Sequence, residues 1–194
     1  FFTDKLIQYL ETHNGLEPFF AYLSFTAPHD PLHIPDDWAD KYKGRYDEGY
    51  EVLREKRKLA LQTIGAIPGS TQLSTLMSGV KSWDSLTTRE RKISARKMEV
   101  YAAMISYMDN QIGRLFHFLK SRNQLENTLV IFISDNGAAG GETFRYSKRH
   151  KGAQDWFNKR YDNRLANIGR PGSAVAVGRG WAQASMSPFK FDKG

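Results

Sequence analysis

Hydrophobic positions in the first part of the chain follow a helical pattern and then an extended one. Apolar residues on one face predict a helix over residues 4–13, with Thr3 as its N-cap and Gly15 in the turn that ends it. Residues 19–25 form a short apolar and aromatic run, which is typical of a buried strand. A helix, a glycine turn and a buried strand in succession predict an α/β layered fold.

Prolines after this strand predict a stiff loop that carries candidate chemistry. Three prolines within residues 26–35 exclude a regular helix or a central strand, and the same loop holds His29 and His33. Because sites in open α/β sheets are built on the loops after strand ends, His29 is a candidate proton donor or anion ligand. The alternative is a ring that only hydrogen-bonds within the loop, and His33 has less to favour a chemical role.

The middle of the chain predicts two helices joined by a loop. We expect a charged amphipathic helix over residues 47–64, a long surface loop over residues 65–85, and the longest helix over residues 87–122, which Asn123 ends. In the longest helix, apolar residues recur three or four apart and predict one continuous buried stripe, made of Tyr101, Met104, Ile105, Met108, Ile112, Leu115, Phe116 and Leu119.

Residues 129–133 have the most strand-like pattern in the sequence, and candidate metal ligands follow them. Their apolar, mostly β-branched side chains are typical of a central parallel strand. Asp135 and Asn136 then offer oxygen atoms that suit Ca²⁺ or Mg²⁺, and Gly137 permits a sharp turn. The alternative is an ordinary Asx turn that closes the strand. The pattern weakens afterwards, with one short helix expected near residues 160–167.

Composition narrows the class of protein. The 194 residues, 40% of them hydrophobic, fit one globular domain or a large part of one, and no apolar run is long enough to predict a membrane span. Lys and Arg exceed Asp and Glu by 28 − 21, a net charge of +7, but acidic residues are interleaved and no nucleic-acid motif occurs. We therefore expect no nucleic-acid partner. The absence of Cys excludes disulfides and a Cys nucleophile.

The ordered motifs resemble a sulfatase of the arylsulfatase type, in the alkaline phosphatase superfamily. Residues 27–32 are similar to the family's histidine loop, residues 101–119 to its long helix and residues 134–137 to its metal-binding turn. Residues 179–184 and the later Lys193 are similar to the segment around its active-site lysine. The resemblance covers nearly the whole chain. It implies part of a three-layer α/β fold, in which helices flank a mostly parallel central sheet.

The resemblance also implies a reaction and a site. In this family a hydrated formylglycine, made from Cys or Ser, attacks the sulfur of a sulfate ester, and the alcohol leaves. Asp135 and Asn136 would be two ligands of a Ca²⁺ or Mg²⁺ ion. His29 would contact the sulfate and protonate the leaving oxygen, and Lys193 would bind the sulfate or the bridging oxygen. The implied partner is a small-molecule or carbohydrate sulfate ester.

Departures from the family pattern are equally informative. The nucleophile motif (Cys or Ser, any residue, Pro, any residue, Arg) is absent, as are the paired acidic ligands and the Lys-any-His motif that precede the histidine loop in the family. We therefore expect residues 1–194 to be the central part of a sulfatase catalytic domain, inactive alone, with the formylglycine outside this chain. Two alternatives stay open: a phosphate or phosphonate ester hydrolase of the same superfamily, and a non-enzymatic basic domain that binds polyanions. Oligomeric state and compartment stay undefined.

Overall fold

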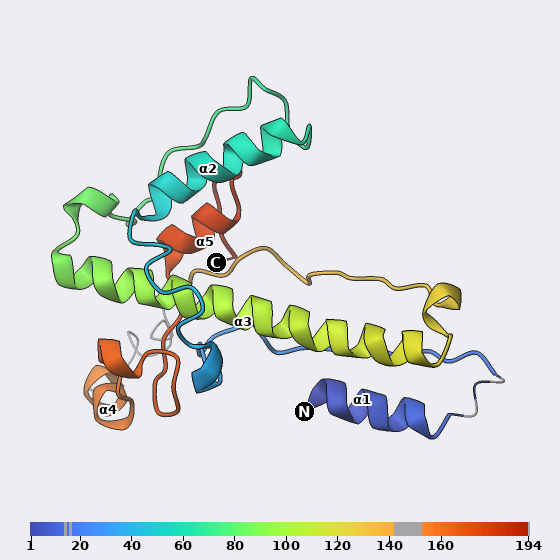
Figure 1. Cartoon of the computed structure of the whole chain (residues 1–194). Helices are drawn as coiled ribbons and strands as arrows, with labels where there is room; N and C mark the ends of the chain where they lie inside the picture. Colours follow the sequence, from blue (N-terminus) through green and yellow to red (C-terminus); the bar gives the residue numbers. More distant parts are fainter. Residues whose placement is uncertain (14, 16, 142–152, 194) are drawn as a thin grey trace.

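The computed structural model describes residues 1–13, 15, 17–141 and 153–193, and helices dominate these residues. Figure 1 shows α3 as the longest element, with α1 beside its C-terminal half, α2 and α5 together near its N-terminal half, and α4 near its start. The α-helices are α1 Phe2–Glu11, α2 Tyr50–Thr63, α3 Thr88–Ser121, α4 Ala153–Arg160 and α5 Arg179–Ser185. The short 3₁₀ helices within the described residues are η1 Asp36–Trp38, η2 Trp83–Ser85, η3 Leu125–Asn127 and η5 Leu165–Asn167.

The ends of α3 confirm the sequence prediction for the longest helix. Thr87 forms a capping box with Glu90: the Glu90 backbone N–H donates to Thr87 Oγ1, and the Thr87 N–H donates to the Glu90 carboxylate. Beyond Arg122, Asn123 adopts the left-handed conformation with φ of 55°, which asparagine tolerates better than most residues. Local chemistry at both ends therefore sets the bounds of this helix.

The predicted cap of α1 is wrong. The helix begins at Phe2 with Phe1 at the N-cap, and Thr3 lies inside the helix with its hydroxyl buried and unpartnered. Thr3 and Leu10 are seven residues apart and are the two buried residues of α1. They lie on one helix face, so packing of that face takes precedence over local capping at Thr3.

An aromatic cluster forms the centre of the packed region. The rings of Trp83, Tyr50 and Trp181 contact one another edge to face, with centroids 5.3–5.5 Å apart. Trp83 and Met77 are buried, so the segment predicted as a surface loop in fact contributes to the core. Gln183 holds this segment, because its side-chain amide accepts from the Met77 N–H and donates to a carbonyl two residues earlier.

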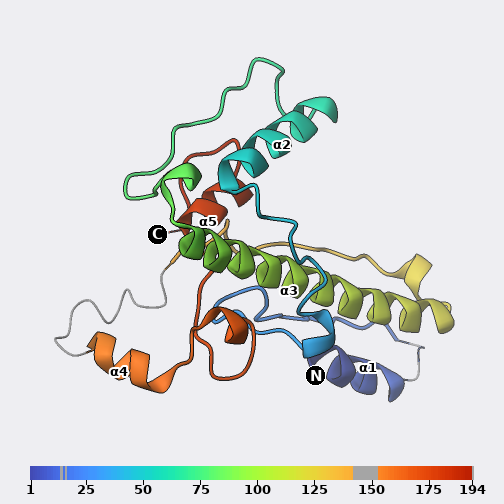
Figure 2. The ribbon, with the colours of Figure 1, turned by 60° about the vertical axis from the view of Figure 1, so that its left-hand side comes forward.

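The two predicted strands are extended, but no β-strand occurs in the part of the chain that the structure describes. Figures 1 and 2 show residues 19–25 and 129–133 running along α3. Their outer side chains are exposed: Phe20 is 94% exposed and Ile131 is 72% exposed. Among the described residues, parallel bridges occur only singly, for example between His33 and Gly169. The expected parallel sheet is therefore not found here, because these segments lack extended neighbours to pair with.

The helix expected near residues 160–167 is also displaced. The structure has α4 before this range and η5 within it, separated by a turn in which Asp162 accepts from the Arg164 backbone and side chain. Asn163 accepts from the Ala174 N–H, which ties the turn to a distant segment. Side-chain acceptors at 162 and 163 thus interrupt the helix. No helix among the described residues has the length and hydropathy needed to cross a membrane.

Candidate functional site

One groove brings together three of the predicted site residues. His29, Asp135 and Asn136 all line a groove of about 2220 Å³ between the two extended segments and the C-terminal half of α3. His29 comes from the loop after the first segment, and Asp135 and Asn136 come from the turn after the second. The loops that follow both predicted strands therefore line the same groove, although the strands themselves are unpaired.

His29 is presented with one ring nitrogen occupied. Its Nδ1 lies 2.7 Å from the Asp30 carbonyl oxygen and 3.3 Å from Asp30 Oδ1, while 65% of the side chain is exposed. A carbonyl oxygen can only accept, so Nδ1 carries the hydrogen in this contact. In the neutral ring Nε2 is then the free acceptor, and it becomes a donor when protonated. This arrangement suits proton transfer or anion contact from Nε2.

His33 has a structural contact instead. Its Nε2 lies 2.8 Å from the Ser173 carbonyl oxygen, and its backbone bridges Gly169. The ring therefore ties the histidine loop to the segment before α5. This contact gives His33 a structural role, in line with the sequence pattern, which favours His29 for chemistry.

The turn after the second extended segment presents oxygen atoms outward. Ser134 Oγ donates to the Asn136 carbonyl, and Asn136 Nδ2 donates to the Gly137 carbonyl, both over 2.7 Å. Because the amide nitrogen is engaged, the Asn136 side-chain oxygen is left as an acceptor. Residues 135–137 form a bend, so the chain turns here as expected, although Gly137 is not among the glycines with a positive φ. A Cβ there would lie 2.5 Å from Met186 Sδ, so Gly137 makes room for that side chain.

Lys193 is brought to the same turn through its backbone. Its N–H donates to the Ala138 carbonyl over 2.9 Å, and Lys193 and Ala139 form a parallel bridge. Lys193 does not line the groove, although its backbone pairs with the segment that follows the Asp135 turn. Nothing in the sequence pattern indicates this return of the C-terminal segment, because the contact joins residues more than fifty positions apart.

The donor set around the turn fits part of a hard-cation site. Asp135 and Asn136 supply a carboxylate and an amide oxygen, both exposed, and these are ligands that Ca²⁺ and Mg²⁺ accept. Calcium takes about six to eight oxygens, so two residues fill only a part of its shell. Within the described ranges, no group of three or more His, Cys, Asp or Glu residues could hold a metal ion.

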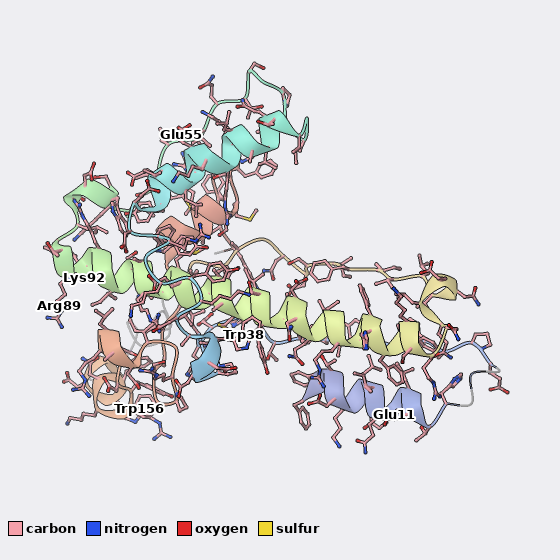
Figure 3. All side chains as sticks on the ribbon, in the orientation of Figure 1. Glu11, Trp38, Glu55, Arg89, Lys92 and Trp156 are labelled. Carbon is pink, nitrogen blue, oxygen red and sulfur yellow. The ribbon has the colours of Figure 1, made fainter. Side chains whose placement is uncertain are left out.

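A second pocket, of about 930 Å³, gathers basic side chains away from these residues. It lies between the start of α3, where Figure 3 labels Arg89 and Lys92, and the end of α4. Asp162 is the one carboxylate among its lining residues, and hydrogen bonds from Arg164 lower the pKa of Asp162 to about 2. None of the predicted site residues lines this pocket. Its basic residues are Arg89, Lys92, Lys159, Arg160 and Arg164.

Comparisons with known proteins identify the family. The Sulfatase family model matches residues 1–162. The chain is 44% identical to an uncharacterized sulfatase of Schizosaccharomyces pombe, over 100% of this chain and 35% of that protein. It is 42% identical to an arylsulfatase of Klebsiella aerogenes, over 89% of this chain and 36% of that protein. It is also 25% identical to a multifunctional alkaline phosphatase superfamily protein of Trinickia caryophylli, over 73% of this chain and 27% of that protein.

These matches agree with the order of motifs in the sequence. The family model covers the histidine loop, the long helix and the Asp135 turn. The chain spans about a third of the length of the first two relatives. The chain belongs to the sulfatase family.

Proposed function

We propose that this chain is part of an enzyme that hydrolyses sulfate esters to an alcohol and sulfate, with aryl or alkyl sulfates as the substrate class. The observation that carries the proposal is the groove that His29, Asp135 and Asn136 share, in a chain of the sulfatase family. A proton donor for the leaving oxygen and hard oxygen ligands for a cation are two of the parts that transfer of a sulfuryl group requires, and the nucleophile that attacks sulfur is the third.

His29 is the proposed acid for the leaving group. Negative charge grows on the ester oxygen as the sulfur–oxygen bond breaks, so a proton delivered from Nε2 lowers the barrier. The contact between Nδ1 and the Asp30 carbonyl holds the ring and leaves Nε2 for this role. Lys193 is the proposed cation for the sulfate or bridging oxygen, because a fixed positive charge stabilises that developing anion.

Asp135 and Asn136 are the proposed holders of a Ca²⁺ or Mg²⁺ ion. A divalent cation there would neutralise negative charge on the sulfate oxygens. The carboxylate supplies charge, and the Asn136 oxygen stays available because its Nδ2 donates to the Gly137 carbonyl. The remaining ligands and the formylglycine would come from outside this chain, which has no Cys and no matching Ser motif.

We also infer that residues 1–194 are the central part of a larger catalytic domain with a mostly parallel sheet. Residues 19–25 and 129–133 would be strands of that sheet, paired with strands from outside this chain. The exposure of Phe20 and Ile131 supports this, because apolar side chains of this size are normally buried in sheets that helices cover.

The test is turnover of an aryl sulfate by the full-length protein with added Ca²⁺. We expect hydrolysis that a chelator removes and that Ca²⁺ restores, whereas the isolated chain of 194 residues should show no turnover above its His29→Ala control. Turnover by the isolated chain would contradict the proposal that the site is completed elsewhere. Absence of sulfate release by the full-length protein would contradict the function.

The second candidate is a phosphate or phosphonate ester hydrolase of the same superfamily. The similarity to a multifunctional alkaline phosphatase superfamily protein supports it, because phosphate and sulfate esters present similar tetrahedral anions. Parallel assays with an aryl sulfate and an aryl phosphate separate the two. A kcat/KM for the phosphate above that for the sulfate would assign phosphate chemistry.

The third candidate, binding of a polyanion without catalysis, rests on the basic pocket at the start of α3. It predicts that affinity for a polyanion falls steeply with salt while no ester is cleaved. Binding of the polyanion that does not depend on salt, together with cleavage of a sulfate ester, would contradict this third candidate.

A further inference from the structure

The segment after α5 folds back and packs on residues 137–140, next to the Asp135 turn. Met186 Sδ lies 3.1 Å from the Ala138 backbone nitrogen, and the Lys193 N–H donates to the Ala138 carbonyl. The backbone of Lys193 is therefore fixed against the segment that follows the proposed metal ligands, while the residue itself is exposed.

Asp192 anchors this segment through an ion pair in which its carboxylate is buried and the Arg179 side chain is 40% exposed. The Asp192 side chain is only 5% exposed, and Arg179 approaches both of its oxygens, with Nε–Oδ2 and Nη2–Oδ1 distances of 3.4 Å. Burial of an unpaired carboxylate is costly, so Arg179 is the group that permits Asp192 to lie here. Arg179 is held in turn, because its Nη1 donates to the Ser78 carbonyl over 3.1 Å.

Gly140 allows the close approach that the ion pair needs. A Cβ at Gly140 would lie 2.5 Å from the Arg179 Cα and 2.5 Å from Asp192 Oδ2. The first of these atoms belongs to the backbone of α5 and cannot move aside cheaply. Gly140, Arg179 and Asp192 thus meet at one point in the fold. Asp192 is the residue that directly precedes Lys193.

We propose that Asp192 and Arg179 are positioning residues for Lys193. Their ion pair, seated on Gly140, fixes the backbone from which the Lys193 ammonium reaches the sulfate. This inference rests on the proposed function and deepens it. It explains how Lys193, a proposed substrate-binding residue, is held in place by Asp192 and Arg179, which need not touch the substrate. A small displacement of a catalytic group can lower a rate by about 10²-fold.

A double-mutant cycle in the full-length protein tests the assignment with an aryl sulfate and Ca²⁺. We expect Asp192→Asn to lower kcat/KM about tenfold in the native background and less than about twofold in a Lys193→Ala background. Arg179→Lys, which keeps the charge but loses the planar fork, should give a smaller loss with the same dependence on Lys193. Asp36→Asn is the matched control, because Asp36 forms an exposed pair with Arg170 over 2.8 Å.

The outcomes separate the inference from the proposed function. If the full-length protein cleaves the ester and Asp192→Asn lowers kcat/KM equally in the native and Lys193→Ala backgrounds, the positioning role is overturned. An unchanged rate in Lys193→Ala would overturn it too, and so would an Asp36→Asn loss as large as that of Asp192→Asn. If Asp192→Asn does not fold, Arg179→Lys completes the cycle. A full-length protein that does not cleave the ester would instead overturn the proposed function.

Discussion

The two halves of α3 have different surroundings. In the N-terminal half, Met98, Val100 and Ala103 are at most 1% exposed. In the C-terminal half, Ile112 and Phe116 are only partly buried and line the large groove. Of the eight apolar residues in the buried stripe that the pattern predicts over residues 101–119, only Met104 and Leu119 are buried.

The difference teaches that periodicity defines a face but not what covers it. The N-terminal half packs against the aromatic cluster around Trp181, whose Nε1 also donates to Ser94 of α3. The C-terminal half faces two extended segments whose own outer side chains are exposed. Under the proposed function, the open half is where strands from outside this chain would complete the sheet and the site.

The largest effect on stability is expected at the centre of the packed half. Trp181 is 1% exposed and contacts both Tyr50 and Trp83. Trp181→Ala should lower the free energy of unfolding by about 3–5 kcal/mol, because it removes a large buried ring and its hydrogen bond. Urea unfolding of the chain measures this, and a loss below about 1 kcal/mol would contradict the packing described here.

The matched substitution in the open half is Ile131→Ala. Because Ile131 is 72% exposed, we expect a change within about 0.5 kcal/mol in this chain. In the full-length protein the same substitution should cost about 2–5 kcal/mol if residues 129–133 become a buried strand. Equal costs in both proteins would break the distinction between the two halves.

Gly140 and Gly141 offer the next comparison. Gly140→Ala places a Cβ against the Arg179 Cα, so we expect a loss of about 1–3 kcal/mol from overpacking. An added Cβ at Gly141 meets no atom of the described residues within 4 Å, and Gly141→Ala should be close to neutral. Thermal unfolding of the two variants side by side checks this, and equal shifts in Tm would contradict the close approach.

A smaller effect is expected at the start of α3. Thr87→Ala removes the side-chain acceptor of the capping box and should cost about 1 kcal/mol. Thr88→Ala is the control, because Thr88 is the first helical residue and not the cap. A cost for Thr88→Ala that matches that of Thr87→Ala would show that the capping box does not carry the effect.

The same box predicts a pH dependence. Hydrogen bonds from the Thr87 backbone and side chain lower the pKa of Glu90 from 4.5 to about 2. A pKa that is lower in the folded state means that the ionised carboxylate stabilises the fold above about pH 4.5, and that this contribution is lost as pH falls toward 2. Glu90→Gln should therefore reduce the acid sensitivity of Tm in this window. An unchanged pH profile would contradict it.

Local signals in the sequence predict the helices best. The capping box at Thr87 and the left-handed Asn123 define α3 because both act within one turn of the chain. Thr3 has the residue type of a cap, yet the helix face that it shares with Leu10 is buried. Packing, which the local pattern does not contain, decides that position.

Long-range contacts account for what the sequence does not predict. The extended character of residues 19–25 and 129–133 is evident in the pattern, but pairing depends on neighbours that the described residues do not provide. His29, Asp135 and Asn136 could be singled out because each follows such a run. The ion pair between Arg179 and Asp192 could not, because neither residue lies in a motif and their meeting depends on the space at Gly140.

The most direct test of the proposed site compares the two histidines of the loop in the full-length protein. His29→Ala should lower kcat for an aryl sulfate by about 10²-fold or more, because it removes the proton donor for the leaving oxygen. His33→Ala should lower Tm, since its ring contacts the Ser173 carbonyl, and should change kcat by less than about threefold at a temperature where the variant is folded. Equal kcat for His29→Ala and the native enzyme would contradict the account.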